Sequence, residues 1–240
     1  MGKIVAIGGG DALEIHQAIV RLSGKTNPNL LFIPTASSDS TSYYEHIKSI
    51  YEDTLGCKTD VLYLLQKTVN LSVAEEKILG SDAIYVGGGN TLKMMRRWRY
   101  MGIDNILKTA YHNDIVLSGI SAGAICWFSY GHSDSMSFYN PDDWDYVRVT
   151  GLGLVNMIFC PHLDAEKRLQ SFQEMVAKHK EIGIGLDNDA AIEIVGERFR
   201  IITARDDAAG YKVFKHRGKI VTEVLKRNSE LEPLANLLSN

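Results

Sequence analysis

The sequence predicts an α/β fold in which a doubly wound, mostly parallel sheet is covered by helices on both faces. Two observations carry this prediction. Short apolar segments alternate with longer segments whose apolar residues recur at helical spacing, from the beginning of the 240-residue chain. The short segments are almost continuously apolar, as expected of parallel strands that are buried on both faces. Right-handed crossovers between such strands produce a three-layer α/β/α sandwich.

Five strands are expected in the first half of the chain, each ending near glycine, proline or polar residues. They cover residues 3–7, 29–33, 61–64, 83–86 and 115–120. Helices are expected between them over residues 11–22, from Ser40 or Thr41 to Leu55, after Ser72, and from Asn90 to His112 with a break near Gly102. Ser40 or Thr41 is a suitable N-cap, and Ser72 with Glu75 forms a capping-box pattern.

The second half of the chain is less regular. Residues 133–150 are polar and rich in aromatic side chains, and we expect a long loop there, a feature that is often functional. Further strands are expected over residues 152–160, 182–186, 191–195, 199–203 and 211–214, with a hairpin turn at 195–198 and a terminal helix at 231–238. No repeat or linker divides the sequence, so we expect one domain over residues 1–240.

Composition excludes several classes of protein. The chain is 45% hydrophobic and 23% charged, which is typical of a globular domain rather than a disordered chain. No apolar run reaches the ~18 residues of a membrane span, and the chain enters a strand at once, so we expect a cytoplasmic protein without a membrane partner. The three cysteines lack C-x-x-C spacing and no H-E-x-x-H motif occurs, so no disulfide framework, metal or cofactor is expected.

Charge also limits the partners. The formal net charge is −3, whereas nucleic-acid-binding domains are usually basic, so no nucleic-acid partner is expected. One basic cluster stands out, consisting of Lys93, Arg96, Arg97 and Arg99 followed by Tyr100. A solvated helix face is its ordinary interpretation, and a phosphate-binding surface is the alternative.

Three glycine-rich turns follow expected strands, and ligands of open α/β sheets bind beyond the carboxyl ends of the strands. They are Gly8-Gly9-Gly10, Gly87-Gly88-Gly89, and Gly119 with Gly123 around Ser121. The first turn does not fit the dinucleotide fingerprint G-x-G-x-x-G, because Leu13 stands at its last position and Asp11 would repel a pyrophosphate. A tight strand-to-helix turn capped by Asp11 is the simpler interpretation.

The third turn has the form of a nucleophile elbow. Residues 119–123 read G-x-S-x-G between an apolar strand and a helix-compatible segment, which is the context that this motif requires. Small flanking residues allow the tight turn that exposes the Ser121 hydroxyl, and the Ala122 amide would point toward the developing oxyanion. A structural turn of small residues is the alternative.

A serine nucleophile needs a base, and seven histidines are candidates. His16, His46, His112 and His179 fall within expected helices, His216 lies in a basic turn, and helix and turn should carry His132 away from Ser121. His162 follows an apolar run and Pro161, and precedes a helix that is expected to start near Asp164. His162 is therefore our candidate general base, with a histidine satisfied by local hydrogen bonds as the alternative.

The motifs together resemble the peptidase E family, which comprises aspartyl dipeptidases and, more distantly, cyanophycinases. The similar motifs are V-G-G-G-N-T at 86–91, G-I-S-A-G-A at 119–124 and Pro161-His162, and the resemblance spans residues 3–189. It implies a fold related to class I glutamine amidotransferases, which is flavodoxin-like. It also implies a serine peptidase with Ser121 as nucleophile and His162 as base. The oxyanion hole would consist of the Gly88 and Ala122 amides.

The resemblance implies the acidic member of the triad less directly. Asp134 matches approximately the aspartate assigned to the charge relay of aspartyl dipeptidases, and we rank it first. Other relatives suggest an acid after a later strand, where this chain reads Asp187-Asn188-Asp189, with asparagine at the expected glutamate position. Asn188 can orient a histidine but cannot stabilise imidazolium by charge, and Asp187 or Asp189 could substitute for it.

The family preference for an N-terminal aspartyl residue implies a cation for the substrate carboxylate. Arg168 is the candidate, with Lys167 and Arg205 as competitors, and a plain surface charge is the alternative for each. The aromatic residues of the 133–150 excursion could wall a small pocket or simply pack on the sheet: Phe138, Tyr139, Trp144 and Tyr146.

We therefore expect a monomeric or homodimeric serine peptidase that cleaves dipeptides or short peptides. Two alternatives remain open at this point. One is an isopeptidase or esterase of the cyanophycinase-like branch. The other is a non-catalytic module in which the glycine turns hold a small anion.

Overall fold

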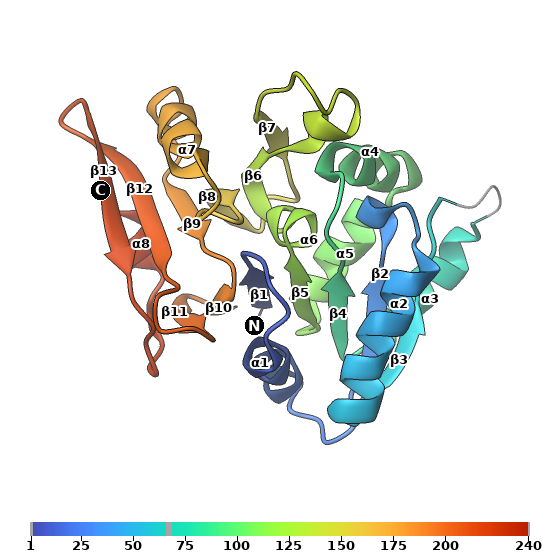
Figure 1. Ribbon diagram of the computed structural model, residues 1–240. Coiled ribbons are helices and arrows are strands. Elements are labelled where there is room, and N and C mark those ends of the chain that lie inside the picture. Colours follow the sequence, from blue (N-terminus) through green and yellow to red (C-terminus); the bar gives the residue numbers. More distant parts are fainter. Residues whose placement is uncertain (1, 66–68, 240) are drawn as a thin grey trace.

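The computed structural model, which describes residues 2–65 and 69–239, contains the expected parallel sheet (Figure 1). Five strands pair in parallel in the order β1-β5-β4-β2-β3. Their bounds are β1 Lys3–Ile7, β2 Asn29–Ile33, β3 Lys58–Val61, β4 Ala83–Val86 and β5 Val116–Ile120. Because these strands are parallel, the carboxyl ends of β1, β4 and β5 meet at one edge of the sheet, where ligands of such folds bind.

Helices cover both faces of this sheet, which confirms the three-layer α/β fold. Val5 and Ile7 of β1 face one side and pack in the same core as α1 (Leu13–Ser23) and α2 (Thr41–Lys48), the second of which continues as a π-helix over Ser49–Thr54. Ile4 and Ala6 face the other side, toward three further helices. These are α3 Leu71–Leu79, α4 Thr91–Met101 and α5 Ile103–His112.

The sheet is extended past β1 by antiparallel strands. β10 (Ala190–Val195) pairs with β1 and turns back as β11 (Arg198–Thr203), so the expected hairpin is present. The short strand β14 (Glu232–Pro233) closes this edge, and α8 (Ala235–Leu238) follows it.

A second sheet lies beside the first and carries much of the later chain, at the left of Figure 1. Its order is β13-β12-β9-β8-β6-β7, with β6, β8 and β9 parallel. The bounds are β6 Phe128–Ser133, β7 Val147–Thr150, β8 Val155–Cys160, β9 Gly183–Leu186, β12 Gly210–His216 and β13 Lys219–Leu225. Helix α7 (Arg168–Ala177) packs on it, and the largest core cluster includes residues of both sheets.

Several local predictions were wrong. The third strand covers Lys58–Val61 rather than 61–64, because β3 is a polar edge strand and the apolar Leu62 and Leu64 are buried after it. Asn70, not Ser72, caps α3: its Oδ1 accepts from the Ser72 amide at 3.0 Å. Strand β13 was not expected, and none of its residues is buried.

Three further expectations concern segments near the site. Residues 133–150 are not one loop, because η3 (Ser135–Phe138) and β7 lie within them. Helix α7 begins at Arg168, four residues later than expected. Asp11 does not cap α1, whose N-cap is Ala12 without a side-chain hydrogen bond. Among the described residues no helix is long and apolar enough to cross a membrane.

Candidate active site

Ser121 lies in a strained turn at the carboxyl end of β5. Its φ of 55° and ψ of −114° fall in a region that side chains other than glycine rarely adopt, and helix α6 (Ala122–Ile125) follows at once. A Cβ at Gly119 would overlap the Gly123 carbonyl, and one at Gly123 would overlap the Val86 carbonyl. The glycines of G-x-S-x-G are thus required by close approach of the turn to itself and to β4, which is the geometry of a nucleophile elbow.

The second glycine turn lies directly beside this serine. A Cβ built on Gly88 would be 3.4 Å from the Ser121 Cβ. Within the described residues, neither the Gly88 amide nor the Ala122 amide donates to a backbone carbonyl. Burial raises the pKa of Tyr43, and a hydrogen bond from the Gly88 backbone partly offsets this effect. Both amides can therefore donate a hydrogen bond to a side chain or to a ligand.

His162 follows β8 in a left-handed conformation, with a φ of 51°. Its Nδ1 is 2.7 Å from the Asn188 Oδ1. The side-chain Nδ2 of Asn188 donates to the Asp164 Oδ1 at 2.8 Å, and the backbone N–H of Asn188 donates to the same oxygen at 3.0 Å. Because a carboxylate only accepts, this pairing fixes the orientation of the Asn188 amide group, and Oδ1 must face the histidine.

The chain of hydrogen bonds decides which histidine nitrogen carries the proton. An amide oxygen only accepts, so His162 Nδ1 is the donor and Nε2 keeps its lone pair. Burial lowers the pKa of His162, while the hydrogen bond with Asn188 and the charges of Asp134 and Asp164 act in the opposite direction. His162 is therefore a neutral imidazole at neutral pH, with Nε2 free to accept a proton.

The backbone brings Ser121 and His162 to the same strand end. The Ser121 amide donates to the Ile7 carbonyl at 3.1 Å, and the His162 amide donates to the Gly8 carbonyl at 3.2 Å. A Cβ on Gly9 would overlap the Asn188 Oδ1 and lie 2.6 Å from the His162 Cε1. The first glycine turn thus makes room for the histidine and its partner, a role that the sequence did not indicate.

Asp187 and Asp189 bind groups other than His162. The buried Asp187 carboxylate accepts from the Ala209 amide at 3.0 Å and from the Tyr211 hydroxyl at 3.2 Å, and burial raises its pKa. Asp189 forms an ion pair with Arg205 at 3.3 Å. Of the three residues at 187–189, the structure brings Asn188 to the histidine.

Asp134 also binds elsewhere. Its Oδ2 pairs with the Arg168 guanidinium at 3.3 Å, and a second Arg168 nitrogen donates to the His132 carbonyl at 3.4 Å. Arg168 is only 4% exposed and lies 4.9 Å from the centre of the Tyr146 ring. Its Nε has no hydrogen-bond partner among the described residues. The charges of Arg168 and Asp134 both act on the pKa of His162, so the pair lies within electrostatic reach of the catalytic candidates.

The other residues predicted to bind or enclose the substrate have partners of their own or are exposed. Lys167 is exposed and contacts Glu166 at 3.7 Å, while Arg205 is engaged by three carboxylates, those of Asp164, Asp189 and Asp207. Tyr146 stacks on His132 with ring centres 4.2 Å apart, and Trp144 packs edge-on against Tyr146. Those two aromatic residues pack against the second sheet, whereas Phe138 and Tyr139 are exposed.

The functional residue that sequence reasoning missed is Asp164. It stands two residues after His162, where the sequence indicated only the start of a helix. No local signal separates a helix-start aspartate from one that holds Asn188, because Asn188 follows 24 residues later. Among the described residues no cluster of three or more His, Cys, Asp or Glu side chains could hold a metal ion.

Comparison with known proteins identifies the family. Residues 4–202 match peptidase family S51. This chain belongs to peptidase family S51. The match covers β1 to β11 and therefore includes Ser121, His162 and Asn188. The chain is accordingly a peptidase, a member of the hydrolases.

Relatives agree with this assignment. The chain is 34% identical over 222 residues to the uncharacterized peptidase YgaJ of Bacillus subtilis (strain 168), covering 89% of this chain and 92% of the relative. It is 24% identical over 199 residues to peptidase E of Nostoc sp. (strain PCC 7120 / SAG 25.82 / UTEX 2576), with 78% and 77% covered.

Solved structures share the fold. A peptidase from an acI-B1 Actinobacterium superposes with a TM-score of 0.75 at 18% identity, covering 97% of each chain. A putative peptidase E protein from Listeria monocytogenes EGD-e gives a TM-score of 0.67 at 21% identity, covering 85% of this chain and all of that one. At these identities the likeness concerns the fold.

Proposed function

We propose that this S51 peptidase is a serine peptidase in which Ser121, His162 and Asn188 form the catalytic triad and Asp164 holds Asn188 in place. The observation that carries the proposal is the chain of hydrogen bonds from Asp164 through Asn188 to His162 Nδ1, which leaves Nε2 as a base at the same strand end as a strained serine. An amide in the third position orients the imidazole, while the negative charge stands one residue further away.

The reaction follows from these positions. His162 Nε2 takes the proton of the Ser121 hydroxyl as the serine oxygen attacks the scissile carbonyl. The Gly88 and Ala122 amides stabilise the oxyanion, and His162 then returns the proton to the leaving amine. Water hydrolyses the resulting acyl-enzyme by the same proton transfers in reverse order.

For the substrate we propose dipeptides or short peptides with N-terminal aspartate. Arg168 supports this preference, because the charge of its buried guanidinium acts on His162 and its Nε is unpartnered among the described residues. A substrate carboxylate would compete with Asp134 for the guanidinium, since that pair is already formed in the free protein. The Asp134 carboxylate is thereby expected to set how strongly an acidic side chain is preferred.

A fluorophosphonate probe tests the nucleophile. We expect the native protein to be labelled at one site and Ser121→Ala to remain unlabelled, with kcat lower by roughly 10⁴–10⁶ on the precedent of subtilisin. Ser129→Ala, which changes an exposed serine hydroxyl paired with Asn156, is the matched control and should label normally. Equal labelling of native protein and Ser121→Ala would refute the assignment.

A dipeptide panel tests the specificity separately. Asp-Ala is expected to be cleaved with a higher kcat/KM than Asn-Ala or Ala-Ala, and Arg168→Gln should remove that advantage while Ala-Ala cleavage persists. If Asp-Ala shows no advantage in the native protein, the aspartyl preference is wrong although the serine mechanism stands.

A further inference from the structure

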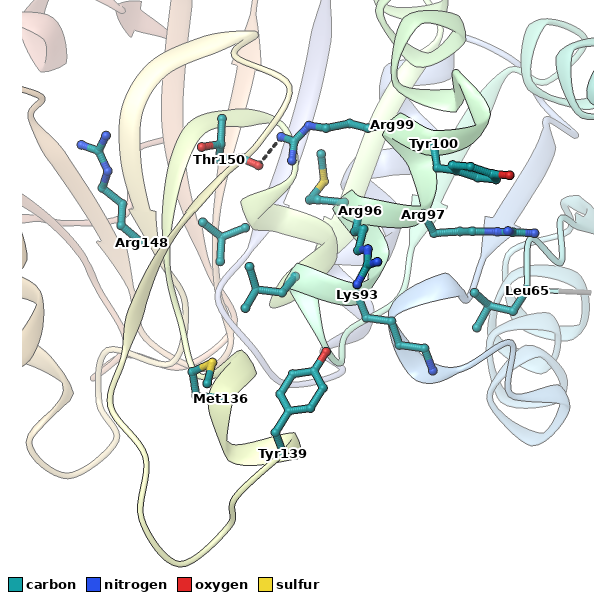
Figure 2. Close-up of a pocket in the computed structure, with 13 residues that line it drawn as sticks. Leu65, Lys93, Arg96, Arg97, Arg99, Tyr100, Met136, Tyr139, Arg148 and Thr150 are labelled. Atoms are coloured by element: carbon teal, nitrogen blue, oxygen red, sulfur yellow. Dashed lines mark hydrogen bonds between the residues drawn. The ribbon is translucent and has the colours of Figure 1, made fainter.

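A pocket of about 870 Å³ lies on the outer side of α4, between that helix, η3 and β7. Figure 2 shows its walls: Lys93, Arg96, Arg97, Arg99 and Tyr100 come from α4, and Met136 and Tyr139 face them from the segment around η3. The volume is within the range of about 300–1,000 Å³ that is usual for small-molecule sites. No residue of the proposed triad lines it.

The pocket concentrates positive charge on a protein whose net charge is −3. Five of its thirteen lining residues are lysine or arginine, and none is aspartate or glutamate. Asp39 is an acid that interacts with the charges of Lys93 and Arg97, but it does not line the pocket and accepts a hydrogen bond from the Leu65 amide. The field inside the pocket therefore favours an anion.

Three of these cations donate to neutral oxygen atoms. Lys93 Nζ donates to the Ser38 hydroxyl at 2.9 Å, Arg97 Nε donates to the Leu64 carbonyl at 2.6 Å, and an Arg99 nitrogen donates to the Thr150 carbonyl at 2.6 Å. Such bonds hold the side chains in place and add no negative charge of their own. Arg148 differs, because it lies over the Tyr130 ring and contacts Glu181.

Arg96 is the free member of the group. Its side chain is exposed and makes no hydrogen bond or ion pair with any residue that the structure describes. In Figure 2 it lies between Lys93 and Arg97, near the middle of the pocket. A guanidinium in this position can bind an oxyanion with two parallel hydrogen bonds.

The spacing of the cations indicates the shape of the anion. Lys93, Arg96 and Arg97 stand at positions i, i+3 and i+4 of α4, so their side chains emerge close together on one face. One compact, multiply charged group fits such a cluster. The acidic side chains along one face of an extended peptide are about 6.6 Å apart and would spread their charge too widely.

The opposite wall supplies apolar and aromatic surface. Met136 is 37% exposed and Tyr139 is 63% exposed, although both are large and largely apolar. Figure 2 places the Tyr139 hydroxyl toward Lys93, with the ring open to the pocket. A flat organic group attached to the anion could rest on this ring.

We propose that this pocket is a second ligand site for a phosphorylated small molecule. Its phosphoryl groups bind Lys93, Arg96 and Arg97, and its organic part contacts Met136 and Tyr139. The site is distinct from the peptidase centre, but Asn90 links the two: it caps α4 by accepting from the Lys93 amide at 3.0 Å and directly follows the glycine turn that contains Gly88.

Calorimetric titration with pyrophosphate and with ADP tests the proposal. Both are expected to bind the native protein and Ser121→Ala equally. Arg96→Glu should weaken both by at least about tenfold, because a hydrogen bond to a charged group is lost. Lys25→Glu makes the same charge change at an exposed residue after α1 and should bind like native protein. Tyr139→Ala should weaken ADP but not pyrophosphate.

Three results would contradict the proposal. Binding that Arg96→Glu leaves unchanged, or that Ser121→Ala abolishes, overturns the assignment of the site. Binding of a peptide rich in glutamate in place of pyrophosphate and ADP overturns the choice of ligand. Arg96→Gln serves as a second variant if thermal melting shows that Arg96→Glu is unfolded.

Discussion

Asp164 offers the sharpest test of the proposed triad, since it touches neither substrate nor His162. Its Oδ1 accepts two hydrogen bonds from Asn188, at 2.8 and 3.0 Å, and these keep the Asn188 oxygen turned toward His162. Asp164→Ala frees the amide to rotate. A rotated amide would present its NH₂ group to Nδ1 and so favour the tautomer with the proton on Nε2, which cannot act as the base.

The size of the effect follows from the exposure of this carboxylate. A hydrogen bond to a charged group contributes about 1.5–3 kcal/mol when water cannot replace it. The Asp164 side chain is 32% exposed, so water can take over part of its role. We therefore expect kcat/KM to fall by about 10–100-fold, well short of the roughly 10⁴-fold cost of a wrong histidine tautomer throughout the population. Asp164→Asn keeps an acceptor and should cost less than Asp164→Ala.

The pH dependence separates positioning from general damage. The Asp164 charge raises the pKa of His162, so removing it lowers that pKa and moves the acid limb of kcat/KM to lower pH. Glu166→Ala removes an exposed carboxylate from the same segment and is the control, with both rate and limb unchanged. Native activity in Asp164→Ala, or an acid limb that moves to higher pH, would refute the reasoning.

Two further predictions concern the same edge of the sheet. Gly9→Ala places a methyl group against the Asn188 Oδ1 and the His162 ring, so activity should fall by at least about tenfold, while the melting temperature falls by only a few degrees; full activity would contradict the packing. Burial, together with the Arg168 charge, lowers the pKa of His132 to about 3, so the unfolded chain binds the extra proton between pH 3 and 6.5. Stability contributed by neutral His132 is therefore complete above pH 6.5 and is lost as the pH falls toward 3. His132→Asn should flatten this slope in urea titrations, and an unchanged slope would show that other groups cause it.

The sequence predicted those parts of the site that local chemistry determines. The strand, glycines and small residues around Ser121 all lie within a few positions of each other, and His162 follows its strand and Pro161 directly. Asn188 was identified only as one of three neighbouring residues. Its selection depends on which of them faces the histidine, and the contacts of Asp187 and Asp189 with Tyr211 and Arg205 decide that.

What could not be predicted depends on contacts across long stretches of chain. The turn at Gly8-Gly9-Gly10 was interpreted as a simple strand-to-helix turn. The residues that it contacts, 162 and 186–189, are far away in the sequence, so its role beside the histidine could not be recognised. The second sheet was not predicted for a related reason. Its strand β13 has no buried residue and is recognisable only once β12 is beside it. Asp134 was ranked first by resemblance, yet it pairs with Arg168 in the folded chain.

The end of β1 explains how such distant segments meet. The carbonyl groups of Ile7, Gly8 and Gly9 accept in turn from the amides of Ser121, His162 and Asp189. Consecutive Cα atoms are about 3.8 Å apart, so three segments are held against three consecutive residues at the end of β1 and in the turn after it. The proposed nucleophile and base are thus placed by backbone hydrogen bonds, and the third of these bonds anchors Asp189, which directly follows Asn188. Because no side chain supplies these bonds, Ser121→Ala or Asn188→Ala should remove the chemistry while the architecture of the site persists.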